Sequence, residues 1–126
     1  MRSILLVDDD DDLRALLRVT LAEQGFEIVG EARDGQEGIE QAARLQPDVI
    51  LLDLSMPMMD GVTVLPRLAE VASSSPVVVL SAHEDLQERV TALGARGFVR
   101  KPTTTAHLAD ILIGVSNGGS AGRPES

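Results

Sequence analysis

Short apolar runs recur along the chain, and a stretch with helical character follows each of them. The runs are rich in leucine and β-branched residues, too short for helices but typical of buried strands. They lie at Ile4–Val7, Ile28–Val29, Val49–Leu52, Val77–Leu80 and Phe98–Val99. The pattern therefore predicts five short strands that alternate with helices.

Apolar residues at helical spacing follow the first three runs. They are Leu13, Leu16, Leu17 and Leu21, then Ile39, Ala42 and Ala43, then Leu65, Leu68 and Ala69. Two further helices are predicted at about Leu86–Leu93 and Thr104–Val115. Strict alternation predicts an α/β fold in which right-handed crossovers join parallel strands and helices cover both faces of the sheet. In such a sheet the ligand site lies beyond the carboxyl ends of the strands.

The composition is that of a single soluble domain. The chain has 126 residues, 44% of them hydrophobic and 25% charged. It lacks cysteine, which excludes disulfides, thiolate metal sites and thiol nucleophiles and favours the cytoplasm. The formal net charge of −9 argues against direct binding to nucleic acid or to an anionic membrane. The run Ile4–Val7 is too short for a membrane span or a signal-peptide core.

The composition changes near residue 116. Residues 116–126 read SNGGSAGRPES, which is rich in glycine and serine and has no apolar period. Such segments are typically flexible. We therefore predict one domain at residues 1–115, followed by a flexible tail or by the start of a linker to a further domain.

Chemically useful side chains follow the predicted strands. Asp8 and Asp9 follow the first strand, Asp53 the third, Ser81 the fourth and Lys101 the fifth. Carboxylates a few ångströms apart repel by roughly 4 kcal/mol at an effective dielectric constant near 20, so such a cluster needs a cation. Oxygen ligands favour Mg²⁺, with Mn²⁺ as an alternative, and Mg²⁺ commonly also binds substrate phosphate oxygens. The pattern indicates a phosphoryl-transfer site.

The chain resembles response-regulator receiver domains of the CheY-like family over about residues 3–115. The resemblance is carried by Ile4–Asp9, Pro47–Gly61, Val79–Ala82 and Gly94–Pro102, which read ILLVDD, PDVILLDLSMPMMDG, VLSA and GARGFVRKP. It implies a flavodoxin-like (βα)5 three-layer sandwich with strand order 2-1-3-4-5. It also implies a two-component phosphorelay protein that is phosphorylated on an aspartate.

The resemblance implies roles for the acidic residues. Asp53 would be the phosphoacceptor, forming an aspartyl phosphate, and would also bind the metal ion. Asp9 would bind Mg²⁺ directly and Asp8 mainly through water. The backbone carbonyl of Ser55 would supply a further ligand.

The same resemblance implies which residues respond to the phosphoryl group on Asp53. Ser81 would hydrogen-bond the attached phosphoryl group, and Lys101 would neutralise one of its oxygens. Pro102 would follow a cis peptide bond. Phe98 would turn inward as Ser81 moves, altering the surface of the fourth helix, fifth strand and fifth helix. A buried core role for Phe98 is the equal alternative.

The implied partners are proteins. The donor would be a histidine kinase or a phosphotransfer protein, and the output would be a downstream protein or a C-terminal effector domain outside this sequence. The output surface could also form a homodimer. Segments Val29–Gly35 and Asp53–Pro57 resemble receivers of helix-turn-helix transcription regulators. No enzymatic activity is expected beyond the domain's own phosphorylation and dephosphorylation.

The acidic motifs allow other interpretations. Asp11 and Asp12 are expected to cap a helix and complement its dipole. An EF-hand loop fails, because Leu13 and Val19 stand where glycine and glutamate are required. A haloacid-dehalogenase-type phosphatase would need a second aspartate where Ser55 stands. A docking module that is never phosphorylated is a further alternative.

Two departures from the family pattern stand out. The spacing from Ser81 to Lys101 is shorter than usual, with the loss near Leu93-Gly94, which could alter the output surface. Pro66 falls in the predicted third helix, which is acceptable only in the first turn.

Overall fold

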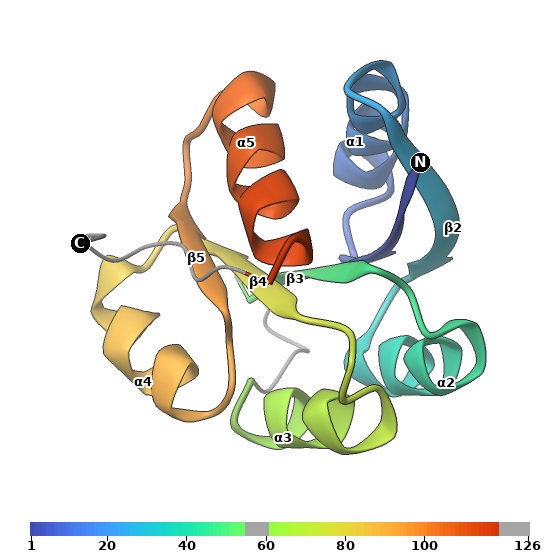
Figure 1. Cartoon of the computed structure of the whole chain (residues 1–126). Coiled ribbons are helices and arrows are strands. Elements are labelled where there is room, and N and C mark those ends of the chain that lie inside the picture. Colours follow the sequence, from blue (N-terminus) through green and yellow to red (C-terminus); the bar gives the residue numbers. More distant parts are fainter. Residues whose placement is uncertain (55–60, 119–126) are drawn as a thin grey trace.

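The computed structural model describes residues 1–54 and 61–118, which form a parallel five-stranded sheet with helices on both faces (Figure 1). The strands are β1 (Arg2–Val7), β2 (Phe26–Ala32), β3 (Val49–Asp53), β4 (Val77–Ser81) and β5 (Gly97–Arg100). They lie in the order β2-β1-β3-β4-β5, and every neighbouring pair is parallel. The predicted fold class and strand order are confirmed.

Helices cover the sheet in two layers. They are α1 (Asp11–Glu23), α2 (Gly35–Leu45), α3 (Gly61–Val71), α4 (Gln87–Ala92) and α5 (Thr105–Ser116), with a 3-10 turn η1 at Glu84–Leu86. In Figure 1, α1 and α5 lie on one side of the sheet and α2, α3 and α4 on the other. The arrangement is the predicted three-layer sandwich.

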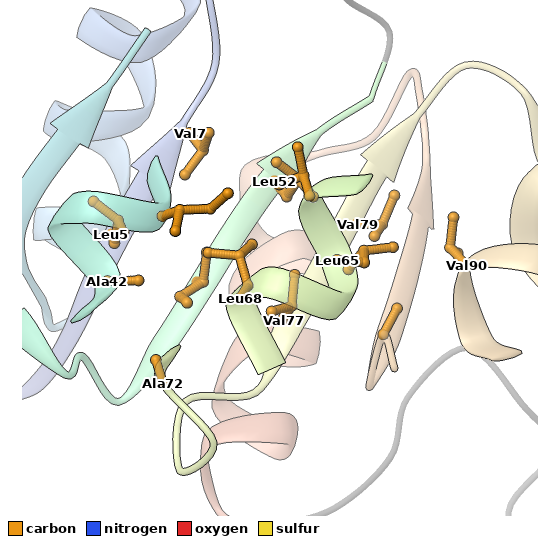
Figure 2. Close-up of a cluster of buried hydrophobic side chains, with 14 of the residues drawn as sticks. Leu5, Val7, Ala42, Leu52, Leu65, Leu68, Ala72, Val77, Val79 and Val90 are labelled. Carbon is orange, nitrogen blue, oxygen red and sulfur yellow. The ribbon is translucent and has the colours of Figure 1, made fainter. Parts of the chain in front are cut away.

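The sheet separates two hydrophobic cores. In β1, Leu5 and Val7 belong to the core on the side of α2 and α3, which Figure 2 shows, whereas Ile4 and Leu6 belong to the core on the side of α1 and α5. A strand covered on both faces needs apolar residues at every position. This explains why the strands were visible in the sequence as uninterrupted apolar runs.

The predicted boundaries depart most from the structure at the second strand. Strand β2 extends well beyond Ile28–Val29, because it is an edge strand with partly exposed positions that a search for apolar runs misses. The fourth helix, Gln87–Ala92, agrees with the prediction within one residue at each end; the 3-10 turn precedes it and Gly94, whose φ is 114°, ends it. Helix α5 spans Thr105–Ser116, within one residue of the predicted helix at each end, and 119–126 lie outside the described residues.

The start of α1 also differs from the prediction. The N-cap is Asp10, whose side chain accepts hydrogen bonds from the backbone N–H groups of Asp12 and Leu13. Asp11 and Asp12 lie in the first turn, where their charges complement the helix dipole. The capping role predicted for Asp11 and Asp12 therefore belongs to Asp10.

Pro66 lies in the interior of α3, not in its first turn. The helix begins at Gly61, so the proline removes an intrahelical hydrogen bond and crowds the carbonyl four residues earlier. Its side chain is exposed, while Leu65 and Leu68 beside it are buried. Burial of the neighbouring leucines holds the helix together despite the proline.

Replacing this proline should stabilise the domain. We expect Pro66→Ala to raise the free energy of unfolding by about 1–3 kcal/mol, because alanine restores the missing N–H and has a far higher helix propensity. Urea denaturation followed by far-UV circular dichroism measures the change in a chain without tryptophan or tyrosine. Arg67→Ala is the control, since Arg67 is an exposed neighbour with only a 4.0 Å ion pair to Glu70. Equal stability of the two variants would contradict the prediction.

Candidate functional site

Four predicted site residues meet at the carboxyl edge of the sheet. Asp8 follows β1, Asp53 ends β3, Ser81 ends β4 and Lys101 follows β5. The strand ladder continues into the site, since the backbone N–H of Lys101 donates to the carbonyl of Ser81 at 2.9 Å. Asp8, Asp53 and Ser81 are all buried. The fold therefore holds these polar groups in fixed positions away from bulk water.

Lys101 and Asp53 form an ion pair across the site. The Lys101 Nζ lies 2.6 Å from Asp53 Oδ2, and the Asp53 side chain is only 4% exposed. Hydrogen bonds between charged partners are stronger than neutral ones, and more so where water is excluded. The peptide bond between Lys101 and Pro102 is cis, as the resemblance implies.

Asp8 is a buried carboxylic acid beside a second carboxylate. Burial is the main cause that raises its pKa to about 7, and the neighbouring Asp53 carboxylate adds to the effect. The hydrogen bond from the Asp10 backbone N–H and the charge of Lys101 act in the opposite direction. The Asp10 bond reaches Asp8 Oδ1 at 2.9 Å. Ionising Asp8 next to Asp53 is therefore costly even with Lys101 present, and a further cation would reduce the cost.

The residues of the site fit a divalent cation. Asp8 Oδ2 is buried and has no hydrogen-bond partner in the described part of the chain, and burial and the neighbouring Asp53 raise the pKa of its carboxyl group to about 7. A hard cation such as Mg²⁺ favours such oxygens and would offset the repulsion between carboxylates.

The predicted ligand set is assembled only in part. Asp8 and Asp53 are close neighbours, but Asp9 is exposed, and no three His, Cys, Asp or Glu side chains among residues 1–54 and 61–118 are grouped to hold a metal ion. Ser55, whose carbonyl was predicted as a ligand, lies outside the described residues. The roles of Asp9 and Ser55 stay predictions.

The two residues predicted to act as a switch are both buried. Ser81 is fully buried, and its Oγ accepts a hydrogen bond from the His83 backbone N–H at 3.0 Å. Phe98 is 7% exposed and belongs to the core that includes Leu65, Val79 and Val90. Phe98 therefore has the core position that sequence analysis held as the alternative, and its movement stays a prediction.

An open apolar groove borders the site. It has a volume of about 450 Å³ and lies between the first half of α1 and the start of α5. Its lining includes Leu13, Leu16, Lys101 and Leu108, and Leu16 is 58% exposed. Lys101 thus belongs both to the polar site and to this groove.

Sequence analysis missed Arg14, which contacts the site from α1. Its guanidinium donates a hydrogen bond to the backbone carbonyl of Asp8. Arg14 precedes Leu17 by three residues and Leu21 by seven, and these three are the buried residues of α1. A charged residue at helical spacing with buried leucines was the available signal.

Comparison with known proteins agrees with this geometry. The family model for the response regulator receiver domain matches residues 4–113. A protein-glutamate methylesterase/protein-glutamine glutaminase from Myxococcus xanthus is 47% identical over 107 residues, which are 82% of this chain and 31% of that protein. The transcriptional regulatory protein PdtaR from Mycobacterium tuberculosis is 40% identical over 115 residues, 88% of this chain and 55% of PdtaR.

A solved structure gives the same result. A chain of the CheX-CheY complex with BeF3 and Mg²⁺ from Borrelia burgdorferi superposes with a TM-score of 0.79 and 30% identity, covering 86% of this chain and 84% of that chain. The fold and the site define an α/β signalling domain with an acidic phosphoryl-transfer site. The chain belongs to the response regulator receiver domain family of two-component systems, whose role is to accept a phosphoryl group.

The similarity covers only part of the curated relatives. The chain spans 31% of the methylesterase and 55% of PdtaR, so their whole-protein activities are not transferred to it. Among the described helices, none is both long and apolar enough to cross a bilayer.

Proposed function

We propose that Asp53 is the phosphoacceptor of this receiver domain and that Mg²⁺ bound by Asp8, Asp9, Asp53 and the Ser55 carbonyl supports the reaction. The observation that carries the proposal is the buried Asp53 carboxylate, paired with Lys101 at 2.6 Å and adjacent to a second buried carboxyl group. This arrangement places a nucleophilic oxygen, a fixed ammonium group and ligands for a cation close together.

The residues perform the transfer by position and charge. An Asp53 oxygen bonds to the donor phosphorus, and the bond from phosphorus to the donor's leaving group breaks in line, with its electron pair leaving on the donor atom. Mg²⁺, when bound, neutralises charge on the transferring phosphoryl oxygens. Lys101 turns from Asp53 toward a phosphoryl oxygen, and the Ser81 hydroxyl donates to another.

The proposed output is a change of surface. The Ser81 Oγ accepts a hydrogen bond from the His83 N–H, so a movement of Ser81 toward the phosphoryl group would be transmitted to the segment before α4. Phe98, three residues before Lys101 on β5, is the proposed second element of the switch. The surface of α4, β5 and α5 would then act on a downstream protein, an effector domain or a second copy of the chain.

The proposed partners and setting follow from this chemistry. The donor is a histidine kinase or a phosphotransfer protein of the cytoplasm, and it would approach Lys101 and Asp53 across the apolar groove that borders them. We propose that residues 1–115 are the receiver domain and that 116–126 form a tail or linker. The domain catalyses only its own phosphorylation and dephosphorylation.

The experiment is intact mass spectrometry of the wild type after incubation with Mg²⁺ and acetyl phosphate. The proposal expects a single labile phosphoryl adduct, which maps to the peptide containing Asp53 and disappears when the metal is chelated. The absence of an adduct, under conditions that label another receiver domain, would favour a docking module that is not phosphorylated.

A further inference from the structure

Arg14 joins α1, the edge strand β2 and the loop that carries Asp8. Its side chain is 10% exposed, and its Nη1 donates to the backbone carbonyl of Asp8. Its Nε lies 3.3 Å from Glu31 Oε1 on β2, and its Nη2 pairs with the Asp11 carboxylate. A buried guanidinium is costly unless its donors are satisfied, and here each partner fixes its orientation.

Three of the four polar atoms of Asp8 are held by named neighbours. Its backbone N–H donates to the carbonyl of Ala32 at 2.9 Å, and its carbonyl accepts from Arg14. Its Oδ1 accepts from the Asp10 backbone N–H at 2.9 Å. The fourth atom, Oδ2, is buried without a hydrogen-bond partner in the described part of the chain. These contacts restrict the Asp8 carboxyl group to an orientation that leaves Oδ2 available beside Asp53.

We infer that Arg14 is a positioning residue for the proposed metal site: it fixes the main chain of Asp8 and thereby keeps Asp8 Oδ2 available as a ligand. The inference rests on the proposed function. Groups that orient a metal ligand affect metal affinity without touching the ion, because a misplaced ligand must be reordered on binding. Glu31 supports this role, because its carboxylate pairs with Arg14 and holds that side chain against β2.

Arg18 provides a matched control one turn along the same helix. Arg18 Nη1 lies 2.7 Å from the other oxygen of Glu31, Oε2, and its side chain is 52% exposed. Its ion pair within the described residues is with Glu31 and not with Asp8. Removing Arg18 therefore perturbs the same carboxylate and the same helix while leaving the contact to the Asp8 carbonyl in place.

The test is a magnesium titration of the full chain, followed by NMR amide shifts and paired with urea denaturation to measure stability. Arg14→Gln should weaken Mg²⁺ binding by about 10- to 100-fold, the range typical of groups that orient metal ligands. Arg14→Lys, which keeps one donor for the Asp8 carbonyl, should recover part of the affinity. Arg18→Gln should bind Mg²⁺ like the wild type. Equal affinities for Arg14→Gln and Arg18→Gln would overturn the inference.

A double-mutant cycle separates positioning from a general loss of structure. If Arg14 acts through Asp8, Arg14→Gln should have little further effect on Mg²⁺ affinity in an Asp8→Asn background. An equal loss in both backgrounds would overturn the inference. If Arg14→Gln does not fold, Arg14→Lys is compared with Arg18→Lys instead. Weaker Mg²⁺ binding by Arg14→Lys would support the inference, and equal Mg²⁺ binding by the two variants would overturn it. Failure of the wild type to bind Mg²⁺ or to be labelled would instead refute the proposed function.

Discussion

Asp53→Ala is expected to carry no phosphoryl group after incubation with Mg²⁺ and acetyl phosphate under conditions that label the wild type. The carboxylate oxygen is the atom that bonds to phosphorus, and alanine has no atom to replace it. Asp8 is the other buried carboxylic acid among the described residues, its Oδ1 is held by the Asp10 backbone N–H, and the proposal assigns it to the metal ion and not to phosphorus. Loss of labelling should therefore be complete, as intact mass will show.

Asp12→Asn is the control for this experiment. Asp12 is an exposed residue in the first turn of α1, so the variant removes one negative charge near the same edge of the sheet. It should be labelled like the wild type, with both variants retaining the wild-type circular dichroism spectrum. An adduct on Asp53→Ala would show that another residue accepts the phosphoryl group, and loss of labelling in Asp12→Asn would show that overall acidity contributes.

The position of the site could be predicted from the sequence, because the parallel topology brings residues that are distant in the chain close together. Parallel strands all end at one edge, so residues that directly follow buried strands come together. Asp53 and Lys101 are 48 residues apart in the chain, yet their side chains form a 2.6 Å ion pair. The strands were recognisable because β3 and β4 are buried at every position.

Features that depend on side-chain packing were not predictable in this way. Asp10 and Asp11 are adjacent aspartates, and which of them caps α1 is decided by the turn after β1. Arg14 looks like an ordinary surface residue until the helix orientation places it with the buried leucines. Strand β2 reads FEIVGEA, in which glutamates and a glycine interrupt the apolar residues, so only Ile28–Val29 forms an apolar run.

The pKa of Asp8 predicts an unusual pH dependence of stability in the metal-free protein. Burial raises this pKa from 3.8 in the unfolded chain to about 7 in the folded domain. Between these values the unfolded state releases the Asp8 proton while the folded state retains it, so the unfolded state is favoured as pH rises. The contribution of Asp8 to stability is present below about pH 4 and is lost progressively up to about pH 7.

The expected loss is about 4 kcal/mol, since each pH unit between the two pKa values is worth about 1.4 kcal/mol. Of this loss, about 3 kcal/mol falls in the two pH units between pH 5 and pH 7. Urea denaturation at pH 5 and pH 8 with a chelator present measures that part. The informative quantity is the difference between the wild type and Asp8→Asn, because any pH dependence that the two proteins share cancels in it. That variant should gain stability relative to the wild type as pH rises, whereas the Asp12→Asn control should follow the wild type.

Saturating Mg²⁺ should reduce the difference in stability between the wild type and Asp8→Asn at pH 8. A cation that binds the ionised form of Asp8 stabilises only the folded state, and it offsets the cost of holding two carboxylates together. The wild type should therefore gain more stability from Mg²⁺ than Asp8→Asn does. Equal pH dependence of the two proteins in chelator would mean that Asp8 is hydrated in the folded state. Equal stabilisation of both by Mg²⁺ would mean that the ion does not bind through the Asp8 carboxylate.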